Sequence, residues 1–171
     1  MSAQKTFETV YRELLSEIYD AEQQMLEGMP RMIRASASEE LRAALELHMA
    51  ETAEQAARLE TIFASFDGPA ARELSDTMRA LIAKSRLQAV RFETSPAGDA
   101  ALIATARQIE HYEIAAYGSA VLLARMLSHT ADAELLRQSL KEEQETSSDL
   151  TQIAETVIMG EELEDAVLEE Q

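Results

Sequence analysis

The sequence has no cysteine and no tryptophan, and its 171 residues include only five glycines and three prolines. Without cysteine the chain cannot form disulfide bonds or thiolate metal sites. Glycine and proline supply many of the turns in β-rich proteins, so their scarcity argues against a fold of many short strands. Residues that favour helices, such as alanine, leucine and glutamate, are abundant. The composition therefore predicts an all-α protein of one domain's length.

Long apolar runs and basic residues are also scarce. No segment approaches the roughly 20 apolar residues of a membrane span, and residues 1–20 lack the basic and apolar regions of an export signal. The 15 Lys and Arg residues against 32 Asp and Glu residues give a formal net charge of −17. This charge repels phosphate backbones and anionic lipid, so we expect no nucleic acid or membrane partner and a cytoplasmic location. Metal ions and other cations remain candidate ligands.

The few turn signals divide the chain into five helical segments. Pro69 and Pro96 both suit the first position of a helix, and Ser36 followed by Glu39 fits a capping box. We expect helices near residues 3–34, 38–65, 70–92, 98–128 and 131–158.

Four of these segments are long enough to span a bundle together, whereas the third is short. Lys84 and Arg86 interrupt its apolar residues, so we interpret 70–92 as a crossover. A crossover lets helices two and four run parallel, while helices one and two, and helices four and five, form antiparallel hairpins. These features predict a ferritin-like four-helix bundle with an additional crossover helix. We assign this domain to residues 1–160 and an acidic tail to residues 161–171.

Acidic residues interrupt the apolar face of each long helix. The interruptions lie near the middle of the helices, so a bundle would bring them to a similar height. On the second helix His48 precedes Glu51 by three residues, which is the Glu/His pair of dinuclear carboxylate sites in reversed order. Tyr19 and Tyr117 fall near the same level and are candidate hydrogen-bond donors. The candidate metal ligands are Glu22, His48, Glu51, Glu110, Glu113 and Glu143.

A buried carboxylate without a partner costs several kcal/mol, so a cluster of such groups would exceed a net stability of ~5–15 kcal/mol. Metal ions, protons or basic residues would each compensate the charge. Carboxylate and imidazole ligands suit iron, manganese or zinc. We therefore expect two Fe or Mn ions per chain, with Zn as a further candidate. In the alternative interpretation the acids are protonated, or paired with Arg58 and Arg107, and no metal binds.

Several segments resemble the YciE/YciF-like family of bacterial ferritin-like stress proteins, and the resemblance covers nearly the whole chain. The matching segments are EIYDAEQQ at 17–24, LHMAETAEQ at 47–55, DAALI at 99–103, IEHYEIAAYG at 109–118 and KEEQ at 141–144. The resemblance implies a five-helix ferritin-like domain, commonly dimeric, with a dinuclear metal site. It places the family's conserved acids on Glu22, Glu51, Glu110, Glu113 and Glu143, with His48 and Gln55 nearby.

Ferritins and rubrerythrins place a histidine three residues after a glutamate on two helices, but here these positions hold Glu54 and Thr146. Neither ferroxidase nor peroxidase chemistry can therefore be carried over from the fold. The leading hypothesis is a metal-binding stress protein that handles oxygen, peroxide or the metal itself, which leaves a di-iron or di-manganese oxidoreductase open. The alternative is a metal-free interaction or protective protein, and a mineral-storing cage ranks last.

The first and fourth helices carry more apolar residues than a single stripe ~100° wide can bury. The surplus includes Phe7, Val10, Leu122 and Met126. We expect a homodimer that covers an apolar helix face. A closed two-fold pair stops at one interface, whereas repulsion between chains of charge −17 opposes further stacking.

Overall fold

The computed structural model describes residues 6–66, 73–92 and 94–169, and it describes side chains as far as Val157. Five helices account for most of this part of the chain, and it contains no strand. Their bounds are α1 Phe7–Ala35, α2 Glu39–Ala64, α3 Asp76–Arg91, α4 Pro96–Met126 and α5 Thr130–Glu169. The all-α prediction is confirmed.

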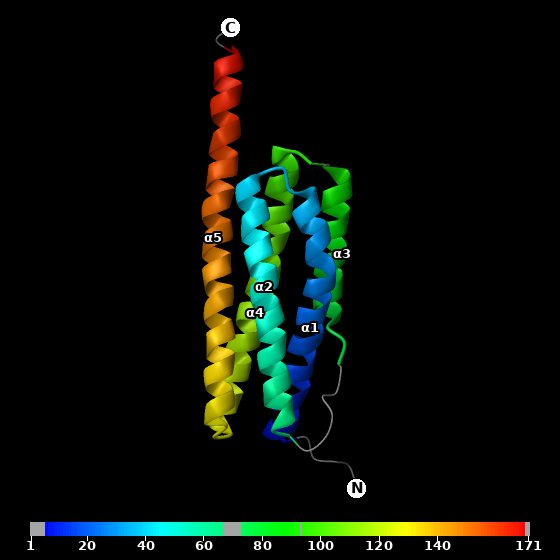
Figure 1. Cartoon of the computed structure of the whole chain (residues 1–171), viewed down its shortest axis with the longest axis vertical. Helices are drawn as coiled ribbons and strands as arrows, with labels where there is room; N and C mark the ends of the chain where they lie inside the picture. The colour runs from blue at the N-terminus through cyan, green and yellow to red at the C-terminus, as the bar shows by residue number, and fades with distance from the viewer. Residues whose placement is uncertain (1–5, 67–72, 93, 170–171) are drawn as a thin grey trace.

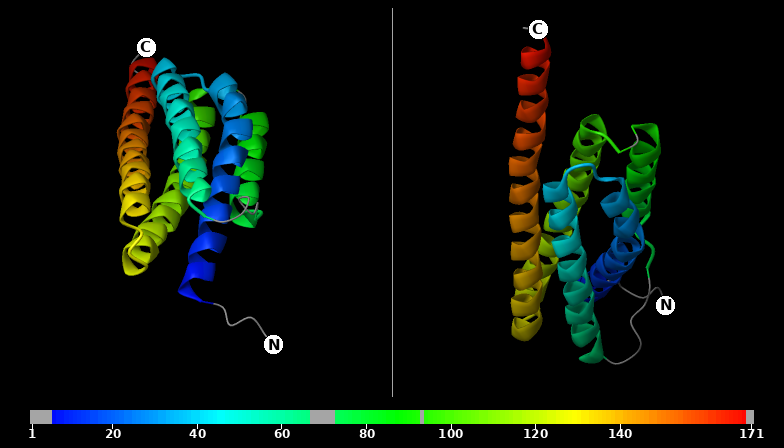
Figure 2. Two further views of the ribbon diagram at one scale, coloured as in Figure 1. Left: turned by 60° about the horizontal axis from the view of Figure 1, so that its bottom comes forward. Right: turned by 45° about the horizontal axis from the view of Figure 1, so that its top comes forward.

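The helices form a bundle of four with one helix added on its side (Figure 1). The chain runs up α1, down α2, up α3, down α4 and up α5, so α2 and α4 are parallel. The four long helices pack in the cyclic order α1, α2, α5, α4, while α3 packs against α1 and α4 (Figure 2). The short third helix is therefore the expected crossover, and the ferritin-like arrangement is confirmed.

Serine and threonine side chains begin four of the helices. The hydroxyl of Ser95 accepts from the backbone N–H of Gly98, and Pro96 follows at the first helical position as expected. The predicted capping box is wrong, because Ser38 caps α2 while Ser36 ends α1. Both serines of this turn suit a cap, and Ser38, directly before the first residue of α2, is the one that forms it.

Two helix boundaries differ from the sequence-based expectation. The third helix begins at Asp76, because Ser75 accepts a hydrogen bond from the N–H of Met78 and caps it there. The expected start near 70 and Pro69 lie outside the described residues. The fifth helix continues past Gly160 to Glu169 and projects beyond the other helices (Figure 1). A single glycine disfavours a helix by only about 1 kcal/mol, and good helix formers follow it.

Two buried aspartates fasten the connections. The carboxylate of Asp99 on α4 accepts from the backbone N–H groups of Ala37 and Ser38 at 2.8 and 2.6 Å, which fixes the turn between α1 and α2. Asp20 on α1 accepts from the backbone N–H of Ser75 at 2.8 Å, directly before α3. The crossover is therefore tied to the first helix through the residue that caps it.

The apolar core is divided along the bundle axis. One cluster includes Tyr11 near the start of α1, Leu59 near the end of α2 and Leu136 near the start of α5, and a second includes Leu41 near the start of α2 and Leu150 farther along α5. A third cluster joins α1, α3 and α4. There α1 and α3 approach so closely that a methyl group added at Gly28 would lie 2.8 Å from Cδ1 of Ile82. Between the first two clusters, the buried positions of α2 and α5 hold mainly polar residues, which are His48, Thr52, Gln55, Ser139 and Glu143.

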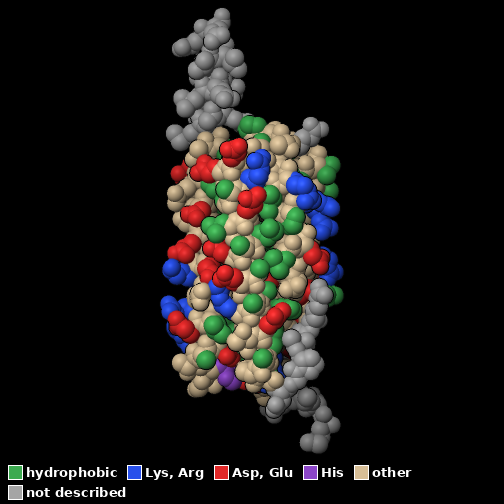
Figure 3. Space-filling model, in the orientation of Figure 1, with side chains coloured by type: hydrophobic (Ala, Val, Ile, Leu, Met, Phe, Trp, Pro, Cys, Tyr) green, Lys and Arg blue, Asp and Glu red, His purple; other side chains and the backbone are tan. Residues whose placement is uncertain are grey.

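No helix in the described part of the chain is long and apolar enough to cross a bilayer. The face in Figure 3 carries acidic groups along α5 and α2, with basic groups toward the edge formed by α3. The basic residues of α3 are Arg79, Lys84, Arg86 and Arg91.

Candidate metal centre

Five buried ionisable side chains occupy the level between the two apolar clusters, and all four long helices contribute. We call Glu22, His48, Glu110, Glu113 and Glu143 the carboxylate cluster. Each of these residues is at most 2% exposed. They are buried because each one falls in the apolar stripe of its helix. On α1, for example, Ile18 and Met25 flank Glu22 at helical spacing and are also buried.

The members of the cluster lie within reach of a shared ion. One potential ligand atom from each of His48, Glu110, Glu113 and Glu143 lies within 4.8 Å of the others. The Nε2 atom of His48 is 3.3 Å from Oε1 of Glu110. Glu22 approaches the same group from α1, and its charge raises the pKa of both Glu110 and Glu113. The structure therefore brings together four of the six predicted ligands, and Glu22 lies beside them, whereas metal binding by these residues stays a prediction.

Most polar atoms of the cluster have no hydrogen-bond partner among the described residues. Both carboxylate oxygens of Glu110 and of Glu113 are in this state, as are both ring nitrogens of His48. One oxygen of Glu22 and one of Glu143 are also without a partner. Buried polar groups in folded proteins are almost always satisfied, so this concentration of unsatisfied atoms requires an explanation.

Burial and mutual repulsion make the charged form of three acids in this cluster unfavourable. Burial is the main cause that raises the pKa of Glu22, Glu110 and Glu113 well above the ordinary value of 4.5, and the neighbouring carboxylates raise it further. Burial also lowers the pKa of His48, which favours neutral imidazole. A neutral imidazole is the form of histidine that binds metal.

Two neutral donors hold one oxygen each in the cluster. The hydroxyl of Tyr117 donates to Oε1 of Glu22 at 2.5 Å, as expected for a tyrosine at this level. The amide of Gln55 donates to Oε1 of Glu143, also at 2.5 Å. Tyr19, the other tyrosine predicted at this level, instead donates to the exposed Glu60. Gln55 lies in the buried stripe of α2, four residues before Leu59, and this spacing is the sequence signal for its position.

The two arginines considered as counter-charges do not pair with the cluster. Arg58 binds both oxygens of Glu142 at 2.6 and 2.7 Å, and it also pairs with Glu54. In the described part of the chain neither Arg58 nor Arg107 forms an ion pair with a member of the cluster. Pairing with arginine therefore does not explain the buried acids.

Glu51 lies apart from the other predicted ligands. It is half-buried at the seam between α2 and α5, where the hydroxyl of Thr146 lies 3.5 Å from its carboxylate. Glu51 lines a surface groove of about 340 Å³ together with Glu145 and Asp149. Burial and the charges of Glu142 and Glu143 raise its pKa. It therefore stands between the cluster and the solvent.

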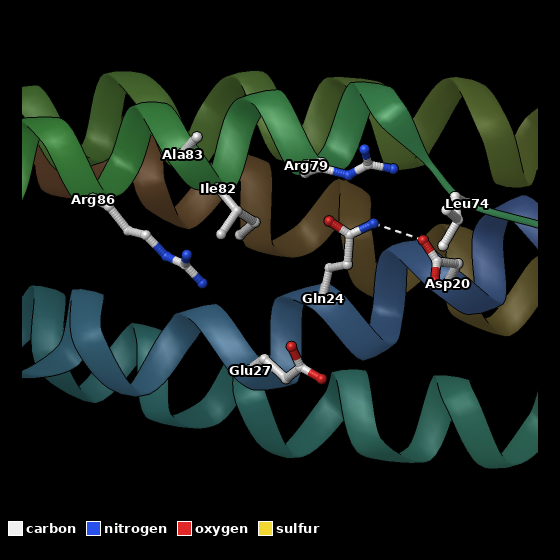
Figure 4. Close-up of a pocket in the computed structure, with 8 residues that line it drawn as sticks. All are labelled: Asp20, Gln24, Glu27, Leu74, Arg79, Ile82, Ala83 and Arg86. Carbon is white, nitrogen blue, oxygen red and sulfur yellow. Dashed lines mark hydrogen bonds between the residues drawn. The ribbon is translucent and has the colours of Figure 1, made fainter.

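A second pocket, of about 320 Å³, lies between α1 and α3 (Figure 4). Arg79 and Arg86 line it from α3, and Gln24 and Glu27 line it from α1. The amide of Gln24 donates to the carboxylate of Asp20, drawn as the dashed line in Figure 4. Asp20 and Gln24 both bind the backbone of Ser75 directly before α3, and none of the lining residues belongs to the carboxylate cluster.

The donor set of the cluster has the chemistry of a binding site for a transition metal. Carboxylate and imidazole are ligands that iron, manganese and zinc accept, and three carboxylates and one imidazole of the cluster lie within 4.8 Å of one another. Carboxylates contributed by several helices of a bundle are also the way that dinuclear carboxylate proteins build their sites. The atoms without partners are the atoms that would bind the ions.

Comparison with known proteins identifies relatives across nearly the whole chain. A family described as "Domain of unknown function (DUF892)" matches residues 6–163. The protein YciF of Escherichia coli strain K12 is 36% identical over 151 residues, which cover 88% of this chain and 91% of YciF.

Two solved structures share the fold. The crystal structure of the E. coli stress protein YciF matches with a TM-score of 0.87 and 35% identity, over 91% of this chain and 98% of that chain. The structure of YcfI from Rhodopseudomonas palustris matches with a TM-score of 0.83 and 30% identity, over 88% and 97% of the two chains.

Proposed function

The chain belongs to the DUF892 family, and from this membership and its carboxylate cluster we propose that it is a stress protein whose helical bundle binds metal ions. Its homology to the E. coli stress protein YciF supports the first part of this proposal. The cluster supports the second part. A cytoplasmic location, expected from the sequence, is part of the same proposal.

The observation that carries the proposal is the set of buried ligand atoms without partners in the described residues. Glu110 and Glu113 are each 1% exposed, and none of their four carboxylate oxygens has a hydrogen-bond donor there. Leaving a buried charge uncompensated destabilises a protein by several kcal/mol. A cation that binds at this point compensates the charge and satisfies the oxygens at once.

We propose that the site takes two Fe or Mn ions, with Zn as the further candidate. The inner ligands are Glu22, His48, Glu110, Glu113 and Glu143. Glu51 contributes from the rim, and its half-buried position gives it a smaller share of the affinity. Bound iron or manganese would supply redox chemistry toward oxygen or peroxide. The residues of the cluster would hold the ions in place and exclude bulk water from them.

A second candidate is supported by the raised pKa values of three members of the cluster. Glu22, Glu110 and Glu113 are all shifted toward their neutral form by burial. If protons alone neutralise them, the protein is a metal-free interaction or protective protein. The two candidates differ in one measurable property, which is metal content.

Metal analysis decides between the candidates. We expect protein purified without chelator and supplied with Mn²⁺ or Fe²⁺ to hold up to two ions per chain by elemental analysis. Glu110→Ala and Glu143→Ala each remove a ligand and should lower this number. Glu54→Ala is the matched control, because Glu54 is a highly exposed acid on α2. Equal metal content in wild type, both cluster variants and control would refute the site, and absence of metal from all of them would support the metal-free candidate.

The proposal includes a homodimer. Phe7 is 65% exposed on α1 and Leu122 is 68% exposed on α4, and the other two named residues of the predicted surplus, Val10 and Met126, are 43% and 50% exposed. Exposed apolar side chains of this size favour a covered surface. Light scattering after size exclusion should give twice the 19.0 kDa mass of one chain, and a mass near 19.0 kDa at micromolar concentration would refute the dimer.

A further inference from the structure

The carboxylates of the cluster divide into two kinds. Glu22 on α1 and Glu143 on α5 each have one oxygen bound by a neutral hydrogen-bond donor and one oxygen without a partner. Glu110 and Glu113 on α4 have no donor on either oxygen within the described residues. Two of the four carboxylates are therefore oriented by a donor before any ion is present, and the other two are not.

The donor to Glu22 is itself enclosed. Tyr117 is fully buried and its ring packs in the apolar cluster that also contains Tyr11 and Leu15. A ring enclosed in this way presents its hydroxyl from one direction only. That hydroxyl occupies Oε1 of Glu22 and leaves Oε2 for another partner.

The donor to Glu143 is fixed from its other side. The amide nitrogen of Gln55 also lies 3.1 Å from Oε2 of Glu142. Glu142 is in turn held by both terminal nitrogens of Arg58, and such two-point contacts set the orientation of a carboxylate. A chain of four side chains therefore runs from Arg58, which is 11% exposed, through Glu142 and Gln55 to the fully buried Glu143.

The charge of the two donors is as informative as their position. An arginine or lysine in their place would neutralise the carboxylate and compete with a cation. A hydroxyl and an amide orient the carboxylate while leaving its negative charge in place. Hydrogen bonds of this kind to metal-binding side chains raise metal affinity by about 10- to 100-fold.

We infer that Tyr117 and Gln55 are positioning residues, which preset Glu22 and Glu143 so that one oxygen of each is directed to the ions. This inference rests on the proposed metal site. Two neutral side chains that bind no ion themselves would thus contribute to the affinity of the cluster for metal.

The test uses two variants that remove the donor and keep the bulk of the side chain. Tyr117→Phe removes only the hydroxyl, and Gln55→Met replaces the amide by an apolar chain of similar length. Titration of the full chain with Mn²⁺ should show affinity about 10- to 100-fold weaker for each variant, with unchanged stoichiometry. The visible absorption of bound Co²⁺, which reports ligand geometry, should change in both.

The chain offers a matched control for each variant. Tyr112, on the same helix as Tyr117, donates its hydroxyl to Glu17 outside the cluster, so Tyr112→Phe removes a comparable hydrogen bond. Gln24 donates to Asp20, so Gln24→Met is the counterpart of Gln55→Met. We expect both controls to lower the melting temperature without changing Mn²⁺ affinity.

The outcomes separate the inference from the proposal beneath it. If the wild type binds Mn²⁺ and both cluster variants bind it as tightly as their controls, the inference is overturned and the metal site stands. If the wild type binds neither Mn²⁺, Fe²⁺ nor Co²⁺, the metal site fails and the inference fails with it. Circular dichroism verifies that each variant is folded, and if Gln55→Met does not fold, Tyr117→Phe alone decides the question.

Discussion

Buried acids occur in two regions of this molecule, and their surroundings are opposite. Asp99, at the turn between α1 and α2, is as deeply buried as Glu110 in the middle of the bundle, with both 1% exposed. The carboxylate of Asp99 receives two backbone N–H groups at 2.8 and 2.6 Å. The carboxylate of Glu110 receives no donor from the described residues.

The difference indicates what each region is for. An acid that accepts from backbone N–H groups stabilises the fold, because it satisfies donors that the turn would otherwise leave unpaired. An acid without donors destabilises the fold, and proteins retain such groups where function needs them. Asp99 therefore has a structural role, whereas Glu110 and Glu113 on α4 lower the stability of the metal-free fold.

The largest expected difference between the two regions is that removing the acid changes the free energy of unfolding in opposite directions. Asp99→Ala should destabilise the metal-free protein by about 2–4 kcal/mol, because each buried donor left without an acceptor costs about 1–3 kcal/mol. Glu113→Gln should instead stabilise it by about 1–3 kcal/mol at pH 7.5, since it removes a buried charge at nearly constant shape. Urea unfolding in the presence of a chelator measures both changes.

The control for this pair is Glu54→Gln, which alters an acid that is 74% exposed and should stay within about 0.5 kcal/mol of wild type. If Glu113→Gln destabilised the protein as Asp99→Ala does, the two regions would not differ in kind.

An intermediate effect concerns pH. The folded-state pKa values of Glu22, Glu110 and Glu113 lie above 4.5, so the stability of the metal-free protein falls as pH rises from 4.5 toward those raised values. His48 acts in the opposite sense, because its lowered pKa favours folding as pH rises through 6.5. The effect of three acids is therefore opposed by that of one histidine. A group whose pKa differs between the folded and unfolded states changes stability by about 1.4 kcal/mol for each pH unit between the two values.

We therefore expect metal-free protein to melt several degrees lower at pH 7.5 than at pH 5.5, as measured by calorimetry. Saturating Mn²⁺ should reduce this difference, since a ligand at 100 Kd stabilises the folded state by about 2.7 kcal/mol and is favoured by ionised carboxylates. A melting temperature insensitive to both pH and metal would contradict the comparison.

The smallest effect tests the tightness of the scaffold beside the cluster. Gly28→Ala places a methyl group 2.8 Å from Ile82 and should destabilise the protein by about 1 kcal/mol, because strain outweighs the better helix propensity of alanine. Gly118→Ala meets nothing within 4 Å and should stabilise it by about 0.5–1 kcal/mol. Thermal unfolding of the two variants gives the comparison, and equal shifts would show that α1 and α3 can separate.

The fold was predictable because the periodic spacing of apolar residues determines its main features. The stripe on α1 from Tyr11 through Leu15 to Met29 is buried as its spacing predicts, and the short crossover follows from the polar residues of 70–92. The boundaries were less predictable where local signals compete. Ser36 and Ser38 both suit a cap, and only the path of the chain determines that Ser38 caps α2.

The site was predictable to the level of the helix face and no further. Spacing placed Glu22, Glu110 and Glu143 at one height, but it could not distinguish Glu51, which lies one residue outside the buried face formed by His48 and Thr52. Nor could it predict that Arg58 pairs with Glu142 and not with Glu143, because adjacent residues on a helix point about 100° apart and their partners depend on packing.

The order of the chain through the bundle has a kinetic consequence. The hairpin of α1 and α2 contributes Glu22 and His48, whereas the hairpin of α4 and α5 contributes the remaining carboxylates. Contacts within each hairpin are local and form fast, but the carboxylate cluster is complete only once the two hairpins have docked. A bound ion would therefore act mainly after the transition state for folding, by slowing the separation of the hairpins. The lifetime of the folded protein would depend on metal supply even where its folding rate did not.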